Sequence, residues 1–127
     1  MEVKKDLMYT KDHEWVKIEG EEAYVGLCDY AQNQLGEIVY VELPDVDDEF
    51  DVEDAVAAIE STKAASDLFA PMAGVVTEVN EELEDAPELL NEKPYDAWVV
   101  KMKLEDASAT DGLMNAEEYE KYLKEEA

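Results

Sequence analysis

The stretch IESTKAASDLFAPMAG, residues 59–74, places a single lysine, Lys63, between two short apolar runs. Lys63 is the only basic residue between Lys17 and Lys93, and every other charged residue in that interval is Asp or Glu. Strand-like segments precede it (AVAAIES, 55–61) and follow it (DLFAP), which predicts that Lys63 lies at the tip of a tight hairpin. From these residues alone the lysine is either an ordinary exposed side chain or an amine that carries an acyl group. An acylated lysine would form an arm reaching about 12 Å.

Alternating apolar and polar residues dominate the first hundred positions and indicate antiparallel strands. The segments EWVKIE and AYVGL are separated only by Glu19-Gly20-Glu21, so they are predicted to form a hairpin. The other predicted strands are rich in β-branched and apolar residues: IVYVEL (38–43), VVTEV (75–79) and WVVKMKL (98–104).

Helix signals are few. A short helix is predicted over 29–36, opened by Asp29 as its cap and closed by Gly36. The pattern at 115–118, NAEE, is a capping box that begins a C-terminal helix. Two prolines break the acidic segment 80–96 into loop with at most a short helix. The prediction is a mainly β chain with one short helix in its N-terminal half and helices at its C-terminus.

Length and composition limit the remaining possibilities. At 127 residues the chain is expected to form one domain (1–127), with a core at about 8–104 and a helical tail at 107–126. It lacks an apolar run long enough for a transmembrane helix and the apolar segment of a secretory signal. Cys28 is the only cysteine, which excludes an internal disulfide and suits a reducing compartment. We therefore expect a soluble, cytoplasmic monomer.

The charge is strongly acidic, with 35 Asp and Glu residues against 10 basic ones and a formal net charge of −25. Such a surface repels nucleic acids and anionic lipids, so neither a nucleic-acid nor a membrane partner is expected. Two interpretations of the charge remain open. It is either an adaptation to a cytoplasm with concentrated salt or a means of steering toward basic partner proteins.

No conventional catalytic or metal site emerges from the sequence. A Cys–His nucleophile would have to pair His13 with Cys28, and neither lies in a motif that orients a base. The acidic run DVDDEFDVED (45–54) fails as a calcium loop, because Phe50 stands at the glycine position and Val56 at the final glutamate position. Clusters with zinc-ligand spacing are also missing. The chain is not expected to be an enzyme.

The block Glu60-Ser61-Thr62-Lys63-Ala64, with Pro71 and Gly74 downstream, resembles the attachment hairpin of lipoyl carrier domains. The segments around it are similar, in order, to those of the H proteins of the glycine cleavage system. These segments are YTKDHEWVKIEG (9–20), VGLCDYAQNQLGEIVYVELPDV (25–46), ESTKAASDLFAPMAGVVTEVNEEL (60–83) and PELLNEKPYDAWVVKMK (87–103).

This resemblance implies a lipoyl/biotinyl-type barrel-sandwich hybrid, or hammerhead, fold. It also implies that Lys63 carries lipoate in amide linkage, attached by a lipoate ligase or lipoyl transferase. The carrier would then visit the decarboxylase (P protein), the aminomethyltransferase (T protein) and dihydrolipoyl dehydrogenase (L protein), catalysing none of their reactions.

Four further residues take their roles from the resemblance. Glu60 and Gly74 match positions that the family presents to the lipoylating enzyme, and Gly74 is also expected to allow a turn after Pro71. Glu14 matches a residue that faces the loaded arm, where a carboxylate would accept hydrogen bonds from an amine cation. His13 is a weaker match to the same groove.

The chain departs from the family pattern in two turns. Acids replace the usual glycines around 47–53, and Asp96-Ala97 precedes Trp98 in a loop that looks one residue shorter. Three alternatives to the carrier function stay open. Biotin carriers use the same hairpin, but here Thr62 and Ala64 replace the methionines that usually bracket their lysine. The others are a relay that donates lipoate to other lipoate-dependent complexes and an unmodified acidic interaction module.

Overall fold

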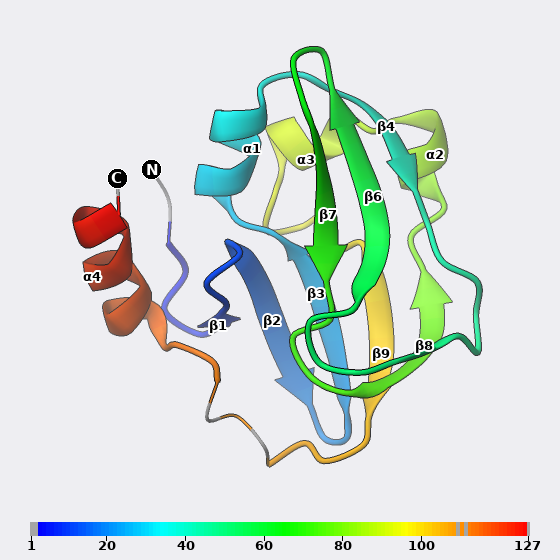
Figure 1. The fold of residues 1–127 in the computed structure, drawn as a ribbon, viewed down its shortest axis with the longest axis vertical. Coiled ribbons are helices and arrows are strands. Elements are labelled where there is room, and N and C mark those ends of the chain that lie inside the picture. The colour runs from blue at the N-terminus through cyan, green and yellow to red at the C-terminus, as the bar shows by residue number, and fades with distance from the viewer. Residues whose placement is uncertain (1–2, 109, 111, 127) are drawn as a thin grey trace.

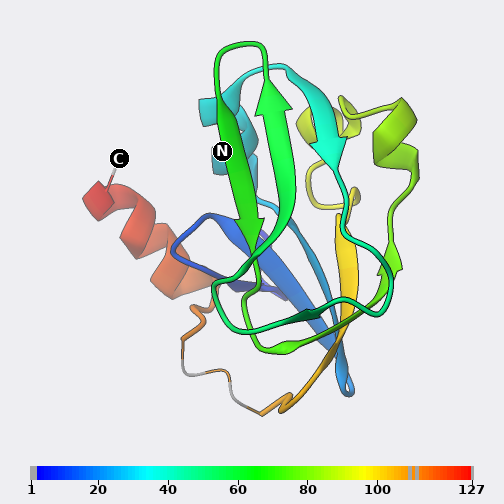
Figure 2. The ribbon, with the colours of Figure 1, turned by 45° about the vertical axis from the view of Figure 1, so that its right-hand side comes forward.

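The computed structural model describes residues 3–108, 110 and 112–126, which form two antiparallel sheets with short helices around them (Figures 1 and 2). One sheet has the strand order β1-β2-β3-β9-β8-β5 and the other the order β4-β6-β7. The strands are β1 (Met8–Tyr9), β2 (Glu14–Glu19), β3 (Glu22–Leu27), β4 (Ile38–Glu42), β5 (Glu49–Phe50), β6 (Ala55–Ser61), β7 (Ala65–Phe69), β8 (Gly74–Val79) and β9 (Val100–Leu104).

The main core lies between the two sheets. Inward-facing side chains of the larger sheet, such as Val25 and Met102, meet Ile59 and Leu68 from the smaller one, and all four are fully buried. Leu83 and Leu90 close the core from the side. Burying each such side chain contributes about 1.5–3 kcal/mol. Because side chains alternate between the two faces of a strand, this energy fixes which face of each strand turns toward the core.

The strand predictions are confirmed with small shifts in their ends. β2 and β3 form the predicted hairpin, pairing Glu19 with Glu22 around Gly20, whose φ is 65°. β9 begins at Val100, two residues later than predicted. β7 begins at Ala65, two residues earlier, and it pairs with β6 to form the hairpin that carries Lys63.

The helices are α1 (Asp29–Leu35), α2 (Glu82–Asp85), α3 (Leu89–Glu92) and α4 (Ala116–Glu126). The prediction of Asp29 as the cap of α1 is wrong, because Cys28 occupies the cap position and Asp29 is the first helical residue. Segment 80–96 holds two single-turn helices, one more than predicted. Both are anchored to the core, by Leu83 and Leu90.

The C-terminal helix α4 begins with the predicted capping box. The Asn115 side chain accepts a hydrogen bond from the Glu118 amide at 2.9 Å, and Glu118 accepts one from the Asn115 amide at 3.0 Å. Tyr119 then stacks on Tyr9 of β1, with ring centroids 4.5 Å apart. This contact holds α4 against the edge of the larger sheet (Figure 1).

The segment 47–53, where acids replace the family's glycines, keeps at two positions a backbone conformation that favours glycine, whereas Asp96 and Ala97 do not adopt it. Asp47 has a φ of 80° and Glu53 a φ of 69°, both in the left-handed region. A side chain there costs about 1 kcal/mol relative to glycine. None of the helices in the described part of the chain is long and apolar enough to cross a membrane.

Candidate functional site at the hairpin tip

Lys63 lies in a tight turn at the tip of the β6–β7 hairpin, which projects at one end of the molecule (Figure 1). Ser61 closes this turn. Its amide donates to the Ala64 carbonyl at 2.8 Å, and its hydroxyl oxygen accepts from the amides of Ala64 at 3.0 Å and Lys63 at 3.3 Å. These bonds fix the backbone of Lys63, while its side chain remains exposed. The predicted tip position is thus confirmed.

The tip is also tied to the loop that follows α1. The Thr62 amide donates to the Glu37 carbonyl at 3.0 Å. Beside this bond, the stem of Lys63 passes over Gly36, where an added Cβ would lie 3.3 Å from Lys63 Cε. Gly36 also has a φ of 79°, so both its conformation and its contact favour glycine. Among the described residues, Lys63 forms no ion pair, and its ammonium group is accessible.

Glu60 lies on the same hairpin, three residues before Lys63. It pairs with Ala65 on β7 and with Tyr40 on β4, and its side chain is exposed on the outer face of the three-stranded sheet. An enzyme that reaches the Lys63 amine would therefore meet the Glu60 carboxylate on the same surface.

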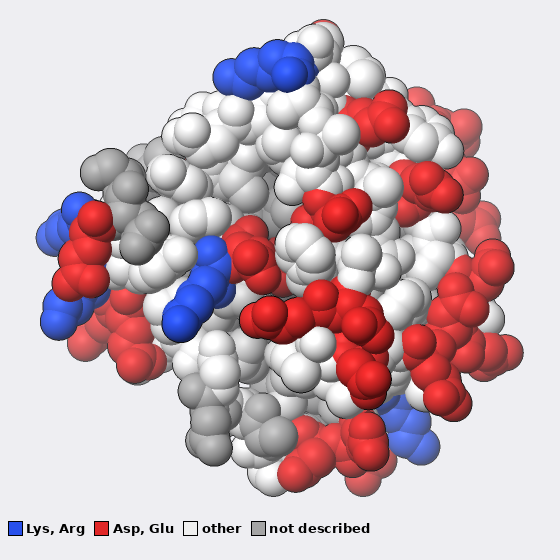
Figure 3. Space-filling model, in the orientation of Figure 1, with Lys and Arg blue, Asp and Glu red and all other residues white. Residues whose placement is uncertain are grey.

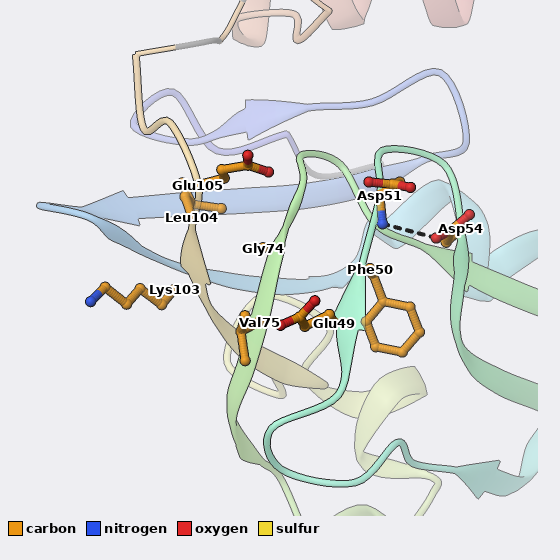
Figure 4. Close-up of a pocket in the computed structure, with 9 residues that line it drawn as sticks. All are labelled: Glu49, Phe50, Asp51, Asp54, Gly74, Val75, Lys103, Leu104 and Glu105. Atoms are coloured by element: carbon orange, nitrogen blue, oxygen red, sulfur yellow. Dashed lines mark hydrogen bonds between the residues drawn. The ribbon is translucent and has the colours of Figure 1, made fainter.

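Gly74 is not close to the tip. It is the first residue of β8, which begins in the half of the molecule away from the hairpin tip, and it pairs with Leu104 of β9 (Figures 1 and 4). An added Cβ would clash with the carbonyl oxygen of Lys103. The chain does bend after Pro71, at 71–73, but Gly74 already belongs to β8, so glycine is required there by the close approach of β9 and not by the turn. Gly74 also lines a hollow of about 610 Å³ bordered by Glu49, Asp51, Lys103 and Glu105 among others.

We predict that Gly74→Ala lowers the free energy of unfolding by about 1–3 kcal/mol, because the new methyl group must push β8 and β9 apart. Urea unfolding measures this, with Gly112→Ala as the matched control, since a Cβ at Gly112 meets nothing within 4 Å. An unchanged free energy of unfolding in Gly74→Ala would contradict this prediction.

Glu14, at the start of β2, is only 1% exposed. Its carboxyl oxygens accept hydrogen bonds from the Thr10 hydroxyl at 3.1 Å and from the Phe69 amide at the end of β7. Burial raises the pKa of Glu14 from 4.5 to about 8, and the Phe69 hydrogen bond opposes this only in part. Glu14 thus joins the larger sheet to the strand that leads back from the Lys63 tip.

Glu14 also lines a hollow of about 360 Å³. Among the described residues, the lining also contains three acids, Asp12, Glu53 and Glu118, and one basic residue, Lys11. Because Glu14 is mainly protonated at neutral pH, the negative charge of the hollow comes from Asp12, Glu53 and Glu118, and it favours a cation over an anion.

His13 precedes Glu14 with a φ of 64° and turns toward a different group of side chains. Its Nδ1 lies 2.9 Å from the Tyr119 hydroxyl of α4, and its ring packs against those of Tyr30 and Tyr122. The structure therefore separates the two neighbours that the sequence grouped together. Glu14 faces the hollow, and His13 links α4 to α1.

Cys28 lies beneath this aromatic group and is fully buried. Burial raises the pKa of its thiol to about 12, so it is protonated at neutral pH and is not a nucleophile. Among the described residues, no three His, Cys, Asp or Glu side chains are placed to hold a metal ion.

Comparison with known proteins identifies the family. A family model described as glycine cleavage H-protein matches residues 7–126, nearly the whole chain. The chain belongs to the glycine cleavage H-protein family. It is 54% identical over 121 residues to the glycine cleavage system H protein of Alkaliphilus oremlandii, covering 95% of each chain. It is 52% identical over 126 residues to that of Thermoanaerobacter pseudethanolicus, covering 99% of this chain and 100% of the relative.

The fold agrees with this assignment. The crystal structure of a glycine cleavage system H protein from Mycobacterium marinum superposes with a TM-score of 0.88 at 32% identity, covering 96% of this chain and 99% of that one. Membership of the H-protein family confirms both the predicted mainly β hammerhead fold and the predicted role as a lipoyl carrier in glycine cleavage.

Two residues of the tip were missed by the sequence reasoning. Ser61 has no role of its own in the prediction from sequence, although a serine hydroxyl can close a turn by hydrogen bonding to nearby backbone groups. Gly36 was read only as a helix end. Its second role, as the surface under the Lys63 stem, depends on tertiary packing and has no local signal.

Proposed function

We propose that Lys63 carries lipoate in amide linkage and thereby shuttles the aminomethyl group of glycine between the components of the glycine cleavage system. One observation carries this proposal: Lys63 is an exposed lysine at a hydrogen-bonded hairpin tip, with no ion pair to any described residue, in a chain that matches the H-protein family over 7–126. The geometry fits the group. Thr62, Ala64 and Ala65 beside the amine are small and exposed, so an acylating site can close around it.

The lipoyl group would supply a dithiolane disulfide that accepts the aminomethyl group. The contribution of the chain itself is presentation. Ser61 and the Thr62–Glu37 bond hold the Cα of Lys63, and the attached arm sweeps a small volume around that point. Tethering of this kind raises the local concentration of the carried group at each enzyme without new contacts.

The partners follow from membership of the glycine cleavage system. They are the P protein that loads the aminomethyl group, the T protein that removes it and the L protein that restores the disulfide, together with the enzyme that attaches lipoate. The chain is a carrier and catalyses none of these steps in this proposal.

The surrounding residues take supporting roles. Glu60 lies where the attaching enzyme must approach, and Gly74 acts at a distance by keeping β8 close to β9. We propose that the acidic hollow lined by Glu14 and Glu53 is the resting place for the amine of the loaded arm, with its charge supplied by Asp12, Glu53 and Glu118 and with Glu14 protonated beside them. His13 takes part only indirectly, by fixing the loop that precedes Glu14.

The acidic surface is proposed to be an adaptation to a salt-rich cytoplasm. Carboxylates spread over the face shown in Figure 3, and the end formed by the hairpin tip has few of them. Such a high density of like charge reduces aggregation but also destabilises the fold by repulsion, and salt at 0.1 M screens the repulsion between charges more than about 10 Å apart.

Reconstitution tests the proposed function. The lipoylated chain, mixed with P protein, glycine and pyridoxal phosphate, should support release of CO2 and gain one aminomethyl group. The same chain without lipoate should support neither. Equal CO2 release from both forms would contradict the carrier role of Lys63.

A further inference from the structure

Two adjacent apolar side chains on β4, Val39 and Tyr40, are both exposed. Neighbouring residues of a strand normally point to opposite faces, so one of this pair should be buried. Here the pairing with β6 shifts between Ile38 and Tyr40, and this bulge turns both side chains outward. Val39 is 50% exposed and Tyr40 49%, while Ile38 and Val41 on either side are buried.

Tyr40 belongs to a row of residues that crosses the outer face of the three-stranded sheet. It pairs with Glu60 of β6, which pairs in turn with Ala65 of β7, and all three are exposed. With Val39 and Glu42, these residues form the surface that we name the Tyr40 face. Ala65 is small and leaves the aromatic ring as the largest apolar group on this face.

The Tyr40 face adjoins Lys63. The Lys63 stem lies on Gly36, and Val39 is only three residues further along the chain, a span of at most about 11 Å. Glu60 lies three residues before Lys63 on the other side. Any protein surface that encloses the Lys63 amine must therefore cover part of this face.

The charge of the face indicates what can bind it. Glu37, Glu42 and Glu60 are exposed around the apolar pair, and β4, β6 and β7 contain no basic residue. A matching partner surface has an apolar recess for Tyr40 with Lys or Arg side chains at its rim.

We propose that the Tyr40 face is the docking surface for the enzyme that forms the amide bond at Lys63, an acyl-transferring enzyme with a basic rim around an apolar recess. This inference rests on the proposed attachment of lipoate to Lys63. Among the partners, the attaching enzyme must approach closest, because it reacts with the amine itself. Enzymes that act on the dithiolane meet the far end of the arm instead.

The experiment measures lipoate attachment to the full-length unmodified chain, using the lipoate-attaching enzyme of the same organism with lipoate and ATP. The double variant Val39→Ser, Tyr40→Ser is compared with Val46→Ser, Val52→Ser, which removes two apolar side chains of similar exposure, 49% and 58%. Initial rates are followed by intact mass over a range of carrier concentrations.

We expect kcat/KM of the Val39, Tyr40 variant to fall by about ten-fold or more, mainly through a higher KM. The Val46, Val52 control should match wild type, and thermal unfolding of both should be nearly unchanged, since the side chains are half exposed. Added KCl should raise KM for wild type, because it screens the acidic rim.

If the two double variants have equal kcat/KM and the wild-type chain still accepts lipoate, the docking proposal is overturned and the proposed function is left intact. Normal attachment with slower transfer to a later enzyme would also overturn it, since the face would then serve another partner. If wild type accepts no lipoate at all, the proposed function itself fails.

Discussion

Replacing Lys63 by arginine is expected to leave the fold unchanged and to abolish both lipoate attachment and aminomethyl transfer. Arginine keeps the positive charge and a stem that can lie over Gly36, but its guanidinium group stays protonated and is not acylated. The side chain is exposed and forms no ion pair among the described residues, so stability should change by less than about 0.5 kcal/mol. The effect is therefore a complete loss of function in a folded protein.

Attachment is read by intact mass after incubation with the lipoate-attaching enzyme, and transfer by CO2 release in the reconstituted system. Lys93→Arg is the matched control, because Lys93 is the next lysine along the chain and is also exposed. Turnover of Lys63→Arg above the background without carrier would count against Lys63 as the point of attachment.

The second large effect concerns Glu14 and pH. Because burial raises the pKa of Glu14 from 4.5 to about 8, the folded chain keeps a proton that the unfolded chain releases between these values. The stability that Glu14 contributes is full below pH 4.5 and is lost as the pH rises through about 8. Each pH unit in this window removes about 1.4 kcal/mol at most, so the total loss is several kcal/mol.

Glu14→Gln should remove this dependence, since glutamine keeps a neutral polar side chain beside Thr10 and Phe69. We expect the variant to be close to wild type at pH 5 and clearly more stable at pH 8.5, by urea unfolding at fixed ionic strength. The other carboxylates are the same in both proteins, so their repulsion drops out of the difference in the free energy of unfolding between variant and wild type. Glu21→Gln, at an exposed site, is the control, and its free energy of unfolding should show the same pH dependence as that of wild type. A constant difference between Glu14→Gln and wild type across this range would refute the prediction.

The hairpin around Lys63 could be predicted from the sequence because strands and tight turns depend on residues that are close together in the chain. Strands show an alternation of apolar and polar residues that can be recognised directly. The C-terminal capping box is local in the same way, and it formed between Asn115 and Glu118 as predicted. The resemblance added the identity of the carrier, which no local pattern supplies.

The errors arose where tertiary contacts decide the outcome. Cys28 rather than Asp29 occupies the N-cap position of α1, without a capping hydrogen bond from its side chain, because β3 extends to Leu27 and leaves only Cys28 between strand and helix. Gly74 is needed because β9, distant in sequence, passes against it. Glu14 looked like an available carboxylate, and only the packing of β7 across it reveals that it is buried and bonded to Phe69.

The most direct test of the carrier account is the intact mass of the protein isolated from its own cells, followed by fragmentation to locate any added group. We predict one lipoyl group, attached through an amide at Lys63. An unmodified Lys63, a biotinyl group there, or lipoate on a different lysine, in cells that make other lipoylated proteins, would contradict it.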